Sequence, residues 1–233
     1  MSDTSTTTAL PTVVLVHGAW ADSSSWSGVI ERLTAAGYPV RAIANPLQGV
    51  ENDTAYLSAI LSSIEGPVVL VGHSYGGAVI TNVDASKFDL KALVYVAGFI
   101  PAAGETVGEL AGQSTPPLTL ANAEVPGGVE VIIEPSTFRA SFAGDVSETE
   151  AAVLAIVQRP ANVKAVAEPI TQQAFQTVPA FALITTQDQA INPDLQRMMV
   201  GRTSAKVSEI DASHAVMVSR PDVVADLIVE AAR

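Results

Sequence analysis

Short apolar runs alternate along the chain with segments whose apolar residues fall at helical spacing. The runs are rich in Val, Ile, Leu and Ala, which is typical of strands buried on both faces. They cover residues 12–16, 40–44, 68–71, 92–97, 180–186 and 206–210. The segments between them place apolar side chains three or four positions apart, as at Trp26, Val29, Ile30 and Leu33. This alternation predicts an α/β fold with a mostly parallel, doubly wound sheet of about six strands.

Boundary residues mark several of the predicted helices. Gly37 ends the first helix, and Asp53 is in a position to be the N-cap of the second. Pro221 opens the last helix at the first-turn position that proline favours. The sequence therefore predicts both the kind of element and its approximate limits.

One long segment interrupts the alternation. Residues 101–178 contain a single strand-like run, at 129–133, and helical patterns in their second half, one of which begins at Ser147. We expect this segment to form a small helical cap, inserted before the penultimate strand of one domain that covers residues 11–233. Residues 1–10 are rich in Ser and Thr and predict a flexible tail.

The chemical centre of the chain follows the third apolar run, at Gly72-His73-Ser74-Tyr75-Gly76. A serine on a tight strand-to-helix turn takes a strained backbone conformation, and glycines on both sides allow the chain to approach closely. The turn exposes the Ser74 hydroxyl, and the N-terminus of the next helix favours a negative oxygen. The pattern predicts a nucleophile elbow, although Gly-x-Ser-x-Gly also occurs where it serves packing alone.

A serine nucleophile needs a neutral imidazole as base and a carboxylate that orients the imidazole. Among the three histidines we expect His17 and His73 to be structural, because each lies in a tight turn at a strand end. His214 follows the last strand and is the candidate base. Asp188 follows the penultimate strand, at the same edge of the sheet, and is the expected carboxylate. Asp211 and Asp194 are the rivals, and are better explained as residues that support a loop and a helix start.

The oxygen of a reacting carbonyl needs two fixed hydrogen-bond donors. One is expected from the backbone N–H of Tyr75, directly after Ser74, and the other from the N–H of Ala19 after the first strand. Gly18 lets the backbone approach there, and we expect Gly18 and Trp20 to contact substrate. Trp26 is expected to be a core aromatic residue.

Composition narrows the possible partners. The 233 residues carry a net charge of −12, which repels nucleic acid. The chain has no cysteine, and its three histidines argue against a structural zinc site. No run approaches the roughly 20 apolar residues that span a bilayer, and the tail lacks the features of a signal peptide. We expect a cytoplasmic protein without metal or cofactor, which binds neither membrane nor nucleic acid; the oligomeric state stays open.

The motifs Val16-His17-Gly18-Ala19-Trp20, Gly72 to Gly77 and Thr186-Gln187-Asp188 resemble the α/β-hydrolase superfamily. More narrowly, they are similar to its compact branch of plant methylesterases, salicylate-binding esterases and hydroxynitrile lyases, with bacterial esterases as the best likeness. The resemblance implies the triad Ser74, Asp188 and His214, the oxyanion donors Ala19 and Tyr75, and a small cap.

Two positions depart from the lyases of that branch. The lyases have Thr after the first motif His and Lys after the triad His, where this chain has Gly18 and Ala215. These departures disfavour the lyase activity. The ordered set of Ser74, Asp188 and His214 predicts a cofactor-independent serine hydrolase that cleaves small, largely apolar carboxylic esters. The alternatives are cleavage of a carbon–carbon bond, as in a hydroxynitrile lyase, and a hydrolase-fold protein that only binds a small ligand.

Overall fold

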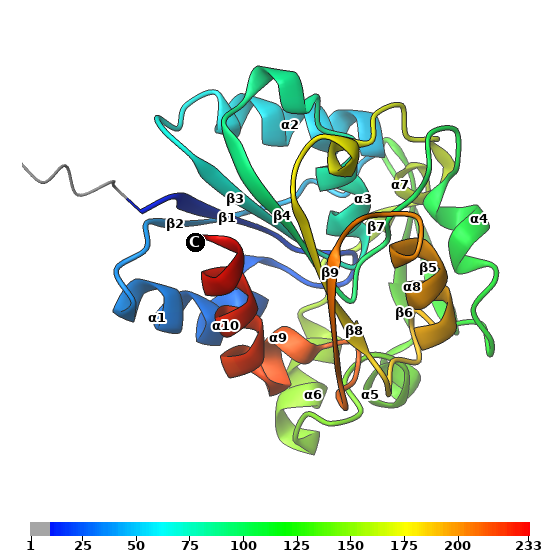
Figure 1. The fold of residues 1–233 in the computed structure, drawn as a ribbon. Coiled ribbons are helices and arrows are strands. Elements are labelled where there is room, and N and C mark those ends of the chain that lie inside the picture. The colour runs from blue at the N-terminus through cyan, green and yellow to red at the C-terminus, as the bar shows by residue number, and fades with distance from the viewer. Residues whose placement is uncertain (1–9) are drawn as a thin grey trace, which may run out of the picture.

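A six-stranded parallel sheet forms the centre of the computed structural model, which describes residues 10–233. The expected tail thus falls almost entirely outside the described residues. The strand order is β2-β1-β3-β4-β8-β9, and the number of strands and their parallel direction are as the alternation predicted. The strands are β1 (Thr12–Val16), β2 (Val40–Ile43), β3 (Val68–His73), β4 (Leu90–Val96), β8 (Ala180–Thr185) and β9 (Lys206–Ile210). They twist through the middle of the molecule in Figure 1.

β3 lies inside the sheet, between β1 and β4, and every one of its residues is buried. The register pairs Gly72 with Val16 of β1 and His73 with Val96 of β4. Because all six strands are parallel, the loops that follow them open at one edge of the sheet. Those loops hold the expected nucleophile, base and carboxylate.

Helices cover both faces of the sheet. One face is covered by α2 (Val50–Leu61), α3 (Tyr75–Thr81) and α8 (Pro193–Val200), and the other by α1 (Ser27–Ala35), α9 (Val216–Ser219) and α10 (Pro221–Ala231). In Figure 1, α2 and α3 lie above the sheet, and α1 and α10 lie below it. Short 3₁₀ turns are formed by η1 (Ser23–Trp26), η2 (Ala85–Lys87) and η3 (Ala174–Gln176).

The helix starts agree with the sequence at two positions and differ at a third. Pro221 is the first residue of α10, and Ser147 caps α6 by accepting a hydrogen bond from the N–H of Glu150. The expectation for Asp53 was wrong, because α2 begins earlier, at Val50, with Gly49 as its N-cap. Asp53 lies in the first turn instead, where its carboxylate accepts hydrogen bonds from inside the fold.

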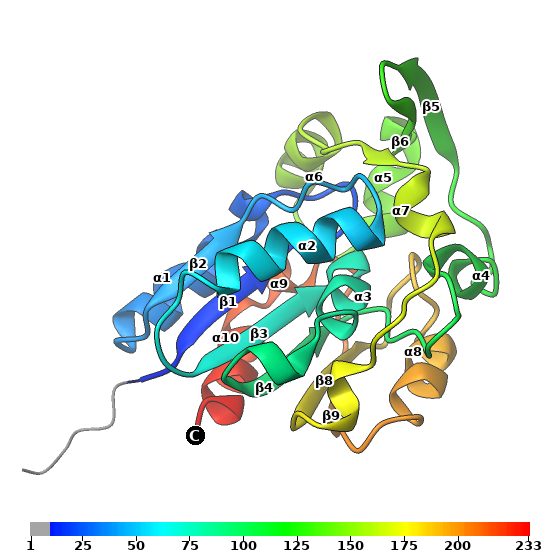
Figure 2. The same cartoon turned by 90° about the horizontal axis from the view of Figure 1, so that it is seen from above.

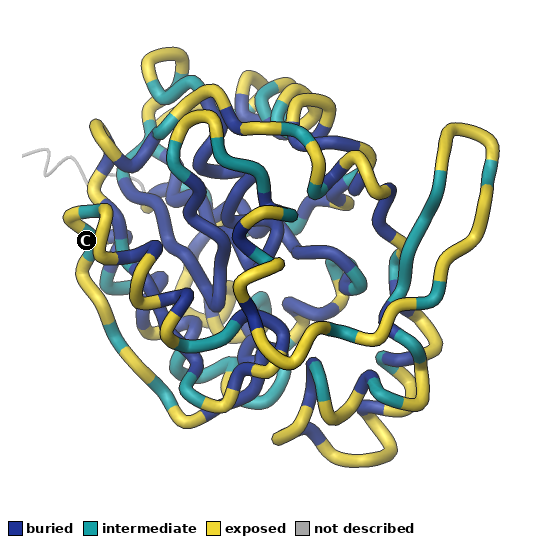
Figure 3. Tube along the Cα trace, turned by 90° about the vertical axis from the view of Figure 1, so that its right-hand side faces the viewer, coloured by how far each residue is buried: buried dark blue, intermediate teal, exposed yellow. Residues whose placement is uncertain are grey.

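The segment expected to form the cap contains strands as well as helices. Its helices are α4 (Val107–Ala111), α5 (Pro135–Phe142), α6 (Glu148–Ile156) and α7 (Lys164–Ala167), and its strands are β5 (Leu120–Val125), β6 (Gly128–Ile133) and β7 (Ala161–Asn162). The strands form an antiparallel sheet in the order β5-β6-β7. The β5–β6 hairpin projects from the body in Figure 2 and is largely exposed in Figure 3. Such a hairpin lacks a buried apolar face, which explains why only the run at 129–133 was predicted.

Backbone hydrogen bonds fasten this segment to the body. The N–H of Asn162 donates to the carbonyl of Leu47 at 2.9 Å, and the N–H of Ala215 donates to the carbonyl of Phe142 at 2.9 Å. Asn82 accepts a bond from the N–H of Thr171 at 2.7 Å. The cap, which we define as residues 101–178, is therefore held along several sides. Within residues 10–233, no helix is both long and apolar enough to cross a membrane.

Candidate active site

Ser74 lies at the tip of the turn between β3 and α3, as predicted. Its φ of 53° and ψ of −123° place a non-glycine residue in a strained conformation. A Cβ on Gly72 would come within 2.5 Å of the carbonyl oxygen of Gly76, and a Cβ on Gly76 within 2.4 Å of that of Val16. Both glycines are thus required by close backbone approach, which fixes the position of the serine against β1.

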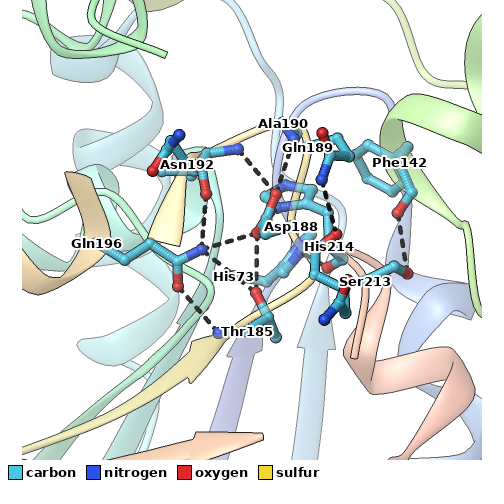
Figure 4. Close-up of polar contacts among 12 residues, drawn as sticks. His73, Phe142, Thr185, Asp188, Gln189, Ala190, Asn192, Gln196, Ser213 and His214 are labelled. Atoms are coloured by element: carbon cyan, nitrogen blue, oxygen red, sulfur yellow. Dashed lines mark hydrogen bonds and ion pairs between the residues drawn. The ribbon is translucent and has the colours of Figure 1, made fainter. Parts of the chain in front are cut away.

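His214 and Asp188 form a fully buried pair. The distance between His214 Nδ1 and Asp188 Oδ2 is 2.7 Å (Figure 4). Because a carboxylate can only accept, the proton lies on Nδ1 and the lone pair of the neutral ring lies on Nε2. Nε2 is buried and has no hydrogen-bond partner within residues 10–233. The imidazole therefore presents a free acceptor, as a general base requires.

The Asp188 carboxylate accepts four further hydrogen bonds. Its Oδ1 receives the backbone N–H groups of Ala190 and Ile191, both at 2.8 Å. Its Oδ2 receives the hydroxyl of Thr185 and the Nε2 of Gln196, both at 2.9 Å (Figure 4). A buried carboxylate with this many donors has one orientation, so the direction of the His214 ring is set as well.

The rival carboxylates do not reach His214. Asp211 is exposed and accepts a bond from the hydroxyl of Thr186 at 3.3 Å. Asp194 lies in the first turn of α8 and pairs with Arg197 at 2.8 Å. Each supports its own surface element, as the sequence indicated.

His73 connects the elbow to the loop that carries His214. The Nε2 of His73 donates to the backbone carbonyl of His214 at 3.0 Å, and the centroids of the two rings are 4.7 Å apart. Burial, together with the nearby His214, lowers the pKa of His73 well below its ordinary value, so His73 stays neutral. It therefore positions the base. Trp26, fully buried, packs edge-on against His73 as a core residue.

The ring of His214 lies beside His73, the neighbour of Ser74 in the elbow, but Ser74 and His214 are not hydrogen-bonded to one another, since His214 Nε2 has no partner within residues 10–233. The Ser74 hydroxyl lies beside Gly18, where an added Cβ would be 3.2 Å from Oγ and 2.6 Å from the serine Cβ. Gly18 thus leaves room for the nucleophile and does not line the cavity in front of it. Hydrogen bonds of a catalytic centre are often open until substrate is bound.

Two residues that line the cavity next to Ser74 have backbone N–H groups that are free within the described part of the chain. Ala19 and Tyr75 line the same cavity as the serine, and no group within residues 10–233 accepts a hydrogen bond from either N–H. The loop that carries Ala19 is held by His17, whose Nδ1 donates to the carbonyl of Gly18 at 2.9 Å. The Nε2 of His17 accepts the N–H of Asn45 at 3.0 Å. Burial lowers the pKa of His17 to about 4, which keeps this ring neutral and structural.

The cavity over Ser74 has a volume of about 60 Å³. Its walls come from the body and from the cap, and they are apolar apart from the serine and the tyrosine. They consist of Ala19, Trp20, Ser74, Tyr75, Phe99, Val107, Ala111, Leu118, Val166, Ala190 and Ile191. Within residues 10–233, no three His, Asp or Glu side chains gather as metal ligands do. The arrangement suits a small, uncharged group next to a serine.

Sequence analysis missed several residues that hold this site. Gln196 and Thr185 support Asp188, and Asn45 fixes His17. Asp53 accepts the hydroxyl of Tyr75 at 2.8 Å. Burial raises the pKa of Asp53, and burial beside this carboxylate raises that of Tyr75. Among these residues, the sequence offers a signal only for Gln196, which is a polar residue in an otherwise apolar helix face.

Comparisons with known proteins agree with this geometry. A model of the alpha/beta hydrolase family matches residues 13–227. Esterase PIR7B of Oryza sativa subsp. japonica is 26% identical over 253 aligned residues, which cover 94% of this chain and 92% of that enzyme. A carbendazim hydrolyzing esterase of Nocardioides sp. is 35% identical over 117 residues, 45% of this chain, and the match spans about half (48%) of that enzyme.

A solved structure has the same fold. It is an extracellular α/β-hydrolase from a Paenibacillus species, whose description gives it structural and functional homology to tobacco salicylic acid binding protein 2. It superposes with a TM-score of 0.80 at 21% identity, over 96% of this chain and 99% of that one. The resemblance seen in the motifs is thereby confirmed. The chain belongs to the α/β-hydrolase family.

Proposed function

We propose that this protein is a serine esterase that cleaves small, largely apolar carboxylic esters through an acyl-enzyme. The observation that carries the proposal is the buried pair of Asp188 and His214. The free Nε2 acceptor of its ring lies in the loop that His73 ties to the elbow of Ser74. A buried acceptor without a partner costs stability. Its presence is explained if Nε2 accepts the proton of the Ser74 hydroxyl during the reaction.

In the first half of the reaction, the Ser74 hydroxyl turns from Gly18 toward His214. Nε2 takes its proton while Oγ attacks the carbonyl carbon of the ester. The electron pair of the carbonyl bond moves to the oxygen, where the N–H groups of Ala19 and Tyr75 stabilise the charge. Asp188 stabilises the imidazolium that forms. The intermediate then expels the alcohol, which receives the proton from Nε2.

In the second half, water takes the place of the alcohol. Nε2 removes a proton from the water as its oxygen attacks the acyl carbon. The same two N–H groups stabilise the second oxyanion, and Ser74 leaves with the proton held on His214. The products are a carboxylic acid and the free enzyme, and no cofactor takes part.

The walls of the cavity support the choice of substrate. Apolar side chains such as Phe99, Val107 and Leu118 surround the serine, and no charged side chain among the described residues 10–233 lines the cavity. A charged acyl group would lose its hydration there without gaining a partner. The related enzymes are named as esterases, which agrees with a small ester as substrate.

The lyase reading has less support. A departing cyanide needs a cation near the base, and the residue after His214 is the fully buried Ala215. A ligand-binding protein would show tight binding with negligible turnover across a series of esters, which separates it from an esterase.

The test is the hydrolysis of p-nitrophenyl acetate by the wild-type protein and by Ser74→Ala. We expect kcat to fall by at least about 10³-fold, since the covalent route is lost, with an unchanged melting temperature. Ser62→Ala, at an exposed serine, is the matched control and should keep full activity. Equal rates for Ser74→Ala and the wild type would overturn the proposal.

A further inference from the structure

Two cavities meet at Trp20. The first is the cavity over Ser74, which we call the serine cavity. The second, of about 20 Å³, is also lined by Trp20, and we call it the rear cavity. Its other walls are Ala21, Asp22, Ser24, Ser25, Phe138, Phe142, Leu154, Val157, Ala215, Met217 and Val218. Within residues 10–233, Trp20 is the one residue that lines both cavities.

The indole of Trp20 is held in place from several sides. Its Nε1 donates to the carbonyl of Val131 at 3.0 Å, and its backbone N–H donates to the carbonyl of Arg159 at 3.2 Å. Both acceptors belong to the cap. Trp20 also packs against both hydrophobic clusters, one on each face of the central sheet. Its φ of 61° is strained for a residue with a side chain, so these contacts fix a conformation that the backbone alone would not favour.

The rear cavity reaches the catalytic centre from the other side. Ala215, directly after the base, lines it, and the ring of Phe142 lies with its centroid 4.7 Å from that of His214. Much of its wall is apolar, and the cap contributes Phe138, Phe142 and Leu154 to it. The carboxylate of Asp22, which also lines the rear cavity, is already engaged by the N–H and the hydroxyl of Ser24.

We infer that Trp20 is a specificity-determining residue, a partition that divides one apolar channel into the serine cavity and the rear cavity. The inference rests on the proposed function and gives it a substrate class, namely esters with a short unbranched chain on the side of Trp20. A longer chain meets the indole. Without the indole, the chain passes into the rear cavity and buries further methylene groups there.

The test is the dependence of kcat/KM on chain length, for p-nitrophenyl esters from acetate to decanoate. We expect the wild type to prefer the shortest chains, and Trp20→Ala to move the optimum to longer ones. In Trp20→Ala, kcat/KM should rise about four-fold for each additional methylene group that is buried, because of the transfer free energy of a methylene group. Trp20→Phe keeps an aromatic partition without the Nε1 donor and should keep the short optimum.

A second substitution shows where the longer chain goes. Leu154→Phe places a larger side chain in the wall of the rear cavity, from a half-buried position in α6, and so fills part of that cavity. It should leave the profile of the wild type unchanged but abolish the gain in the Trp20→Ala background. Effects that simply add, or a gain that persists in the double variant, would overturn the inference.

Folding and the proposed function are controlled separately. Trp20→Leu, which also opens the partition, replaces Trp20→Ala if the melting temperature shows that the alanine variant is unfolded. Binding of methyl esters of the same chain lengths to Ser74→Ala and to Ser74→Ala/Trp20→Ala, measured by calorimetry, reports the channel without turnover. If the wild type turns over esters and all variants share its chain-length optimum, the partition role of Trp20 is overturned, while the esterase proposal stands. No turnover of any ester would overturn the esterase proposal, while the binding series would still support or overturn the partition.

Discussion

Gln196 donates its Nε2 to the same Asp188 oxygen that receives His214, at a distance of 2.9 Å. The amide is fully engaged, since Nε2 also reaches the carbonyl of Ile191 at 2.8 Å and Oε1 accepts the N–H of Thr185 at 3.2 Å. One side chain of α8 thus joins the end of β8, the loop after it and the carboxylate. The orientation of Asp188, the proposed catalytic carboxylate, is therefore set by a residue outside the proposed triad.

Replacing Gln196 by alanine should impair both stability and activity. Buried groups on Asp188, Thr185 and Ile191 lose a partner, which costs about 1–3 kcal/mol of unfolding free energy. A less firmly held Asp188 should lower kcat about ten-fold or more, with little change of KM. Urea unfolding and ester kinetics measure the two effects. Gln113→Ala, at an exposed glutamine, is the control, and an equal response of both variants would refute the role.

Removing the hydroxyl of Tyr75 should cost stability more than activity. The Asp53 carboxylate, fully buried, accepts that hydroxyl at 2.8 Å, and Tyr75→Phe leaves one of its oxygens short of a donor. We expect a loss of about 1–3 kcal/mol. The activity should change much less, because the proposed oxyanion donor is the backbone N–H. Tyr56→Phe, at a tyrosine that is 40% exposed, is the matched control, and stabilities that match in urea would contradict this account.

The elbow should not tolerate a methyl group at Gly76. A Cβ there would lie 2.4 Å from the backbone oxygen of Val16, which cannot move without shifting β1. We expect Gly76→Ala to lose at least about 1–3 kcal/mol of stability, and to lose most of its activity because Ser74 and Ala19 are displaced. At Gly144 the nearest atom would be 3.9 Å from an added Cβ. Gly144→Ala should therefore behave like the wild type, and a harmless Gly76→Ala would exclude the close packing.

The protein should lose stability as the pH falls from about 6.5 to 4. Burial lowers the pKa of His17 from an ordinary 6.5 to about 4, so the unfolded chain binds a proton in this range that the folded protein does not. The free energy of unfolding then falls with the pH, by up to about 3 kcal/mol from His17 alone. The lowered pKa of His73 acts in the same direction.

Asp53 acts in the opposite direction. Its raised pKa makes the folded state the better proton acceptor just above pH 3.8, so this group favours the folded state as the pH falls. The two histidines oppose Asp53. Glu209 and Asp222, whose pKa values are lowered by Arg197 and Arg220, act in the same direction as the histidines, so we expect a net loss of stability. Urea unfolding at pH 7, 6, 5 and 4 measures the sum. A stability that is constant or increases toward pH 4 would show that the histidines are not held neutral.

Much of the fold followed from the sequence because its strands are buried on both faces. A run such as Val68 to Val71 predicts a buried strand. The parallel arrangement of such strands then places Ser74, Asp188 and His214 at one edge of the central sheet. The exposed β5 has no such signal, and its pairing with β6, where the run at 129–133 was predicted, depends on a turn at Gly127, whose φ is 109°. The start of α2 was placed too late because Asp53 has the residue type of a cap.

The support of the site could not be predicted from the sequence. Gln196 lies eight residues after Asp188, on an ordinary amphipathic helix, and only the packing of α8 onto the sheet turns it toward the carboxylate. Trp20 is similar, since its hydrogen bond joins residues 111 positions apart in the chain. Contacts of this range depend on the cap, which was the least regular part of the sequence.

The central claim is that an acyl group passes through the oxygen of Ser74. Intact-protein mass spectrometry of samples quenched in acid during turnover of p-nitrophenyl acetate tests it directly, with peptide mapping of the adduct. The account predicts one acetyl group per chain, on Ser74, which is absent from Ser74→Ala. An acetyl group on another residue, or turnover with no adduct and an undiminished rate in Ser74→Ala, would contradict it.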